Sequence, residues 1–141
     1  MTNQLIHLTP SSAKRAVLGA VIVILILTVL EFPPPLGFET RPQTDVSPFW
    51  LAFFIVILIF EIVTIPMLYR RPSVGGRLGI LAAILNILQV LADQAHIMQT
   101  EVAPFGYSIL EGVVVIASLA LAYFSWAVRQ AADAKAFRPL E

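Results

Sequence analysis

One acid and one histidine have the spacing of a chemical pair on a helix. Asp93 and His96 stand three positions apart in the apolar stretch "LNILQVLADQAHIMQ", and side chains at this spacing share a helix face. With further carboxylates, such a pair resembles half of the Glu-x-x-His arrangement that holds metals in four-helix bundles. Without them, the acid fixes the tautomer of the histidine. Only one copy of the motif is present, so we expect the second role, with the pair joining neighbouring helices.

Asp93 and His96 belong to a narrow polar stripe. At 100° per residue, four polar residues fall within roughly 80° of arc, whereas Gln94 and Gln99 fall outside it. These four are Asn86, Gln89, Asp93 and His96. A second stripe, about 40° wide, is predicted in the next apolar stretch. It consists of Tyr107, Glu111, Ser118 and Ser125. Two such stripes predict helices that pair through their polar faces or enclose a ligand between them.

The elements that position these residues are four apolar stretches. The chain of 141 residues is 58% hydrophobic and 13% charged, with a mean hydropathy of +0.85. Each stretch has about the 20 residues needed to cross a bilayer. The predicted spans are 13–32, 48–69, 77–99 and 106–128. Because the connections are short, we predict an all-α fold, a four-helix antiparallel transmembrane bundle that forms one integral membrane domain over residues 1–141.

Basic residues fall almost entirely on one side of these spans. Eight of the nine Lys and Arg residues lie at the start of the first span, between the second span and the start of the third, or after the fourth, and Arg41 alone lies in the external segment 33–47. The positive-inside rule therefore places both termini in the cytoplasm. We expect a multi-pass protein of a bacterial inner membrane. Its expected partners are the lipid bilayer and a second copy or a larger membrane complex, and the zero net charge argues against a nucleic-acid partner.

This topology also limits the cofactors. His7 falls on the cytoplasmic side and His96 near the outer face, so the two cannot ligate one haem. Cysteine is absent, which excludes thiolate metal sites and cysteine nucleophiles. A mononuclear metal site would need Glu111 and Glu31 beside Asp93 and His96, and we predict no metal.

Acids inside the spans are the strongest functional candidates. Glu31, Asp93 and Glu111 are predicted in the outer part of the bilayer and Glu61 nearer its middle or inner half. An acid at the centre of a span costs about 3 kcal/mol on insertion scales, and such acids often mark proton relays. The structural alternative is a hydrogen bond between helices, which contributes about 0.6 kcal/mol.

Two segments resemble a known family. An acid late in the second span, "FEIVTIPMLYRR", followed by a basic turn and "GGRLGILAAILNILQ", resembles the DoxX-like group of small four-helix bacterial membrane proteins over residues 48–128. The resemblance implies that Glu61 is the family-type acid. It also implies association with a membrane redox system, since some members are small subunits of quinone-linked oxidoreductases. Asp93 and His96 have no counterpart in that pattern.

These observations predict a small membrane protein with a polar core in its outer half and no independent catalytic activity. The core would bind a small amphipathic ligand such as a quinone, or the chain would be a small subunit of a redox complex. The alternatives are a proton-coupled transporter and a purely structural subunit. The candidate ligand-binding or proton-handling residues are Glu31, Glu61, Asn86, Gln89, Asp93, His96, Tyr107 and Glu111.

Overall fold

Four long helices make up the structure. The computed structural model describes residues 9–31, 41 and 46–136, so His7 and most of the segment 33–47 lie outside the described residues. The helices are α1 (Pro10–Glu31), α2 (Pro48–Arg70), α3 (Pro72–Gln94) and α4 (Phe105–Ala136). Each is long and apolar enough to cross a membrane. The predicted all-helical fold with four candidate spans is therefore confirmed.

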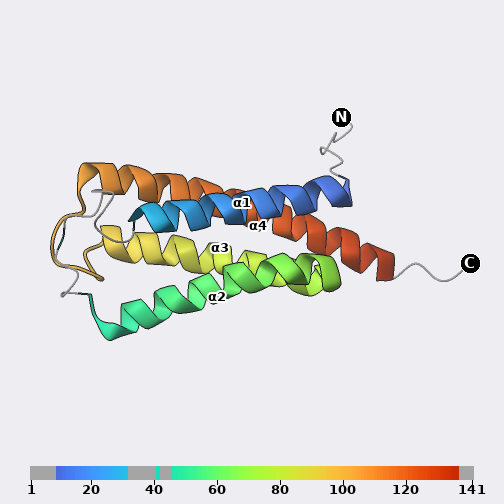
Figure 1. Ribbon diagram of the computed structural model, residues 1–141, viewed down its shortest axis with the longest axis horizontal. Coiled ribbons are helices and arrows are strands. Elements are labelled where there is room, and N and C mark those ends of the chain that lie inside the picture. Colours follow the sequence, from blue (N-terminus) through green and yellow to red (C-terminus); the bar gives the residue numbers. More distant parts are fainter. Residues whose placement is uncertain (1–8, 32–40, 42–45, 137–141) are drawn as a thin grey trace, which may run out of the picture.

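Prolines help to define where the helices begin. Pro10, Pro48 and Pro72 are each the first residue of a helix, a position at which the missing N–H leaves no hydrogen bond unmade. Between α2 and α3 only Arg71 is left outside a helix, and its N–H donates to the carbonyl of Met67 at 2.8 Å. In Figure 1 this tight junction lies at the same end of the molecule as the start of α1 and the end of α4.

The third span ends earlier than the sequence predicted. We expected it to reach residue 99, but α3 ends at Gln94. His96 has a φ of 58°, and its N–H donates to the carbonyl of Asp93 while that of Ile97 donates to Ala92. This pair of bonds around a left-handed residue is a Schellman motif, which closes a helix. The prediction that His96 continues the polar face of the helix is therefore wrong.

The fourth helix is longer than its predicted span. It comprises 32 residues, about 48 Å at the α-helical rise, against a hydrocarbon core of about 30 Å. Its last turns therefore extend beyond the apolar stretch. There Ser73 donates a hydrogen bond to Asp133 at 2.7 Å, and this contact joins the end of α4 to the start of α3.

Glycine residues allow α3 to lie close to two neighbours. A β-carbon at Gly75 would lie 2.5 Å from the backbone nitrogen of Leu68 in α2, and one at Gly76 would lie 2.7 Å from the carbonyl oxygen of Ser125 in α4. A β-carbon at Gly79 would meet the hydroxyl of Ser125. The backbones thus approach through small residues, as is common between membrane helices. α3 is consequently the central helix of the α2–α3–α4 group.

The apolar core lies towards the end at which α1 begins. α1 packs mainly on α4 and makes only sparse contacts with α2. Its buried apolar residues belong to one hydrophobic cluster with Leu68, Ala82, Ala83, Leu121 and Val128. Large apolar side chains remain exposed on all four helices, with Val29 65% and Ile116 68% exposed. This outward apolar surface is typical of helices that contact lipid.

Candidate functional site

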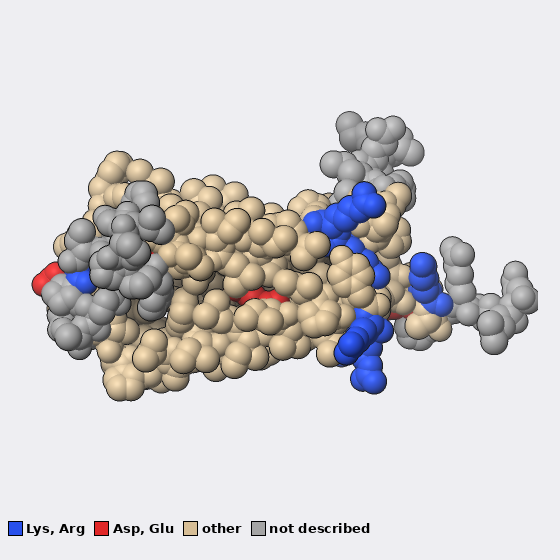
Figure 2. Space-filling view, viewed as in Figure 1, with Lys and Arg blue, Asp and Glu red and all other residues tan. Residues whose placement is uncertain are grey.

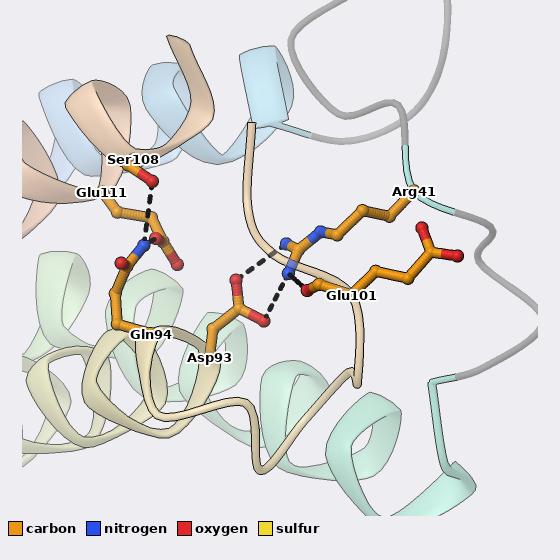
Figure 3. A network of polar contacts seen from close by, with 6 residues as sticks. All are labelled: Arg41, Asp93, Gln94, Glu101, Ser108 and Glu111. Atoms are coloured by element: carbon orange, nitrogen blue, oxygen red, sulfur yellow. Dashed lines mark hydrogen bonds and ion pairs between the residues drawn. The ribbon is translucent and has the colours of Figure 1, made fainter. Parts of the chain in front are cut away.

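A buried ion pair organises the outer end of the molecule, the end opposite the α2–α3 junction. The Nη1 of Arg41 lies 3.1 Å from Oδ1 of Asp93, and its Nη2 lies 2.7 Å from Oδ2. Each side chain is only 4% exposed. Figure 3 shows the guanidinium facing the carboxylate at the end of α3. Two parallel charge-assisted bonds make this the strong, planar form of an arginine–carboxylate pair.

Arg41 has further contacts around this pair. Its guanidinium carbon lies 4.9 Å from the centre of the Tyr107 ring, within the range of a cation–π interaction. Its Nη1 also approaches the carbonyl oxygen of Glu101 at 3.5 Å. Arg41 thus connects the segment between α1 and α2 with α3, α4 and the loop between them.

This arrangement corrects the predicted partner of Asp93. His96 is exposed and lies beyond the end of α3, whereas the Asp93 carboxylate is bound by Arg41. Arg41 is the one basic residue outside the side that carries the other eight. This isolated position was the only signal in the sequence for the pairing of Arg41 with an acid of the spans.

A second group of contacts joins α3 to α4. The amide nitrogen of Gln94 donates to Oε2 of Glu111 and to the hydroxyl of Ser108 at 3.1 Å. Figure 3 shows the amide of Gln94 pointing from α3 towards both side chains. Gln94 was predicted to lie off the polar stripe. It reaches Glu111 because the contact forms at the last residue of α3, close to the start of α4.

Six of the eight predicted site residues line one small cavity. They are Glu31, Asn86, Gln89, Asp93, Tyr107 and Glu111. The cavity also touches Thr28 of α1 and Phe54 of α2, and its volume is about 20 Å³. A cavity needs roughly 10–15 Å³ measured in this way to hold one water molecule. The cavity is therefore polar and the size of a water molecule, with three carboxyl groups in its lining.

Glu61 occupies a separate, deeper position. Its side chain is 1% exposed, and its Oε1 accepts a hydrogen bond of 2.6 Å from the amide of Asn86. Its Oε2 is buried and has no hydrogen-bond partner among the described residues. Asn86 also lines the small cavity described above, which we call the outer cavity. This one side chain therefore connects Glu61 with the polar residues of that cavity.

Further buried hydroxyl groups lie deeper along α4. Ser118 and Ser125 are fully buried, and neither hydroxyl has a hydrogen-bond partner in the part of the chain that the structure describes. Thr64 of α2 donates to the carbonyl of Phe60 at 2.7 Å. Ser125 lies beside Gly79. Buried polar groups therefore continue from the outer cavity towards the opposite end.

The residues considered for a metal site do not form one. Asp93 is held by Arg41 and His96 lies outside the helix. Across residues 9–31, 41 and 46–136, no group of three or more His, Cys, Asp or Glu side chains has an arrangement that could hold a metal ion.

Comparison with known proteins identifies no relative: no family model, curated protein or solved structure matches the chain. The DoxX-like resemblance of residues 48–128 therefore stays a prediction from the residues themselves. Any function proposed for this chain must therefore be inferred from its buried polar groups.

Proposed function

We propose that this chain is a proton-handling, multi-pass protein of a bacterial inner membrane. In this proposal the four helices form an antiparallel transmembrane bundle with both termini in the cytoplasm. The charge distribution supports this orientation, because Figure 2 shows most of the blue basic side chains gathered at one end of the molecule. That end contains the start of α1, the α2–α3 junction and the end of α4, the regions that the positive-inside rule assigns to the cytoplasm.

The single observation that carries the proposal is the environment of Glu61. Its carboxyl group is almost fully buried in the bundle and receives one hydrogen bond, from Asn86, while its second oxygen has no described partner. No described cation forms an ion pair with it. Burial penalises an ionised carboxylate far more than a neutral carboxyl group unless a cation compensates it. Uptake and release of a proton at this position therefore require no ion pair to be broken.

The outer cavity brings further carboxyl groups close to Asn86, the hydrogen-bond partner of Glu61. Three carboxyl groups line the cavity, those of Glu31, Asp93 and Glu111. Among the described residues, one guanidinium, that of Arg41, pairs with an acid of this group. A single water in the cavity would hydrogen-bond to these acids and to Asn86, which in turn contacts Glu61.

A lipophilic carbodiimide tests this proposal, since such reagents modify carboxyl groups that are protonated in an apolar environment. The chain would be reconstituted in lipid vesicles and treated over a range of pH, and the modified residue identified by peptide mass spectrometry. We expect one adduct on Glu61, formed less at high pH and absent in Glu61→Gln. Glu101→Gln is the matched control, because Glu101 is an exposed acid of the α3–α4 loop. Failure of Glu61 to react at any pH would contradict the proposal.

Proton exchange at Glu61 would serve different roles in different membrane assemblies. The DoxX-like resemblance supports a role as the small subunit of a membrane redox complex, which would use Glu61 to take up or release protons. In the alternative, a proton-coupled transporter, the vesicles would show substrate flux driven by a pH gradient and lost in Glu61→Gln. In a purely structural subunit, Glu61→Gln would affect assembly with a partner alone, and this site would show no proton uptake.

Binding of a quinone-like ligand is a second candidate function, and the observation in its favour is the sparse contact between α1 and α2. The cavity has room for about one water molecule, so an aromatic head group fits only if the lining moves apart. The sparse contact between α1 and α2, which contribute Thr28 and Phe54 to the lining, makes this the side that separates most easily. Saturable quenching of the protein's tryptophan fluorescence by a short-chain quinone, reduced in Gln89→Leu, would support this candidate.

A further inference from the structure

The ends of α1 and α2 nearest the α2–α3 junction meet through a cation and an aromatic ring. The Nζ of Lys14 lies 5.7 Å from the centre of the Tyr69 ring, within the range of a cation–π interaction. Tyr69 is nevertheless 58% exposed, and the two helices make only sparse contacts along their length. We call this region, with Lys14 and Arg15 on α1 and Tyr69, Arg70 and Arg71 at the end of α2, the α1–α2 basic seam.

The positive charge of the seam is not neutralised by described acids. The described acid at this end is Asp133, whose carboxylate accepts a hydrogen bond from Ser73 and lies 3.5 Å from Nε of Arg129. No described acid forms an ion pair with the four basic residues of the seam. Figure 2 shows blue side chains near the start of α1 and near the α2–α3 junction, and further ones towards the end of α4. The seam therefore presents a pair of positive groups that an anion between them would satisfy.

The depth of the seam matches that of lipid phosphates. Tyr69 and Arg70 follow Glu61 by eight and nine residues, which corresponds to about 12–14 Å along the helix. The hydrocarbon core of a bilayer extends about 15 Å from its midplane. With Glu61 near the midplane, the basic groups lie at the head-group level. An exposed tyrosine at this level is typical of the membrane interface.

We propose that the α1–α2 basic seam binds an anionic phospholipid. The phosphate would lie between Lys14 of α1 and Arg70 of α2, and an acyl chain would run along the line where the two helices make few contacts. The ligand class follows from the charge: a zwitterionic head group carries its own cation next to the phosphate, whereas an anionic one leaves the phosphate available to both helices. This inference rests on the membrane placement in the proposed function, but not on proton handling.

Arg77 separates this proposal from a general attraction of basic residues to the membrane surface. On α3, Gly75, Gly76 and Gly79 face the neighbouring helices. Arg77 points about 150° away from the mean direction of these glycines and is exposed. It carries the same charge at the same end of the molecule but lies on another face. Arg77→Gln is therefore the matched control for Arg70→Gln.

Native mass spectrometry of the full-length chain from vesicles of equal phosphatidylglycerol and phosphatidylcholine content tests the proposal. We expect one retained phosphatidylglycerol per chain, at least fivefold less in Lys14→Gln and in Arg70→Gln, and unchanged retention in Arg77→Gln and in the charge-conserving Lys14→Arg. Circular dichroism and size exclusion identify any variant that does not fold; if one of Lys14→Gln and Arg70→Gln fails to fold, the other is compared with Arg77→Gln. Equal loss in Arg77→Gln, or equal retention of phosphatidylcholine, would overturn the proposal.

Thermal unfolding in the two pure lipids provides an independent readout. Phosphatidylglycerol should raise the unfolding temperature of the unmodified chain and of Arg77→Gln above that in phosphatidylcholine, because a ligand that binds only the folded state stabilises it. The increase should disappear in Arg70→Gln. If anionic lipid stabilises Arg70→Gln as much as it does Arg77→Gln, the effect is a property of the whole surface and the assigned site is wrong.

Discussion

Arg41 and Asp93, 52 positions apart in the chain, form a buried ion pair with two nitrogen–oxygen contacts of 3.1 and 2.7 Å. The pair fixes the segment between α1 and α2 to the end of α3. Because both side chains are 4% exposed, neither charge can regain its hydration when its partner is removed. The main role of Asp93 is therefore structural: it stabilises the outer end of the molecule.

Removal of either partner should therefore destabilise the fold. We expect Asp93→Asn or Arg41→Gln to lower the free energy of unfolding by about 3–5 kcal/mol, since each removes one half of a buried ion pair. The double variant should lose clearly less than the sum of the two. Equilibrium unfolding in mixed detergent micelles measures all three values, with Glu101→Gln as a control for loss of an exposed acid in the same region. Strictly additive losses would show that the two side chains do not interact in the membrane.

The glycines of α3 should be far more sensitive to substitution than those of α1 and α4. A β-carbon at Gly75 or Gly76 would lie within 2.7 Å of a backbone atom of a neighbouring helix, so Gly75→Ala and Gly76→Ala should each destabilise by about 1–3 kcal/mol through overpacking. A β-carbon at Gly19 or Gly112 meets nothing within 4 Å. Gly19→Ala and Gly112→Ala are the matched controls and should be neutral or slightly stabilising. Unfolding temperatures that fall equally in all four variants would contradict the packing of α3 described above.

His96 should be replaceable by glycine with a gain in stability. Its φ of 58° places it in the left-handed region, which costs a residue with a β-carbon roughly 1 kcal/mol and glycine nothing. His96→Gly should therefore raise the free energy of unfolding by about 1 kcal/mol, whereas His96→Ala, which keeps the β-carbon, should not. The measurement is the same detergent unfolding series. A loss of more than about 1 kcal/mol in both variants would show that the imidazole has a partner that stabilises the fold.

The helices and most of the polar core were predictable because they depend on local periodicity. Apolar stretches of about 20 residues locate the spans, and angular spacing placed Asn86, Gln89 and Asp93 on one face of α3. Those three residues line the cavity together with Tyr107 and Glu111 of α4. Two helices with matching polar faces were therefore enough to identify these five lining residues.

The predictions failed where the outcome depended on backbone closure or on contacts distant in sequence. Angular spacing applies only while a helix continues, and the Schellman motif at His96 ends α3 before the predicted Asp93–His96 pair can form. The sequence between Asp93 and Gln99 contains no glycine or proline to indicate this end. The partner of Asp93 is Arg41, which no local pattern connects to α3.

The most direct test of the account is pH-difference infrared spectroscopy of the chain reconstituted in lipid. A protonated carboxyl group in an apolar environment has its own carbonyl stretching band, separate from that of carboxylates. We predict that a pH step changes the intensity of one such band, that the band is absent in Glu61→Gln, and that it persists in Glu101→Gln. A spectrum of Glu61→Gln identical to that of the unmodified chain at every pH would contradict the claim that Glu61 takes up and releases a proton.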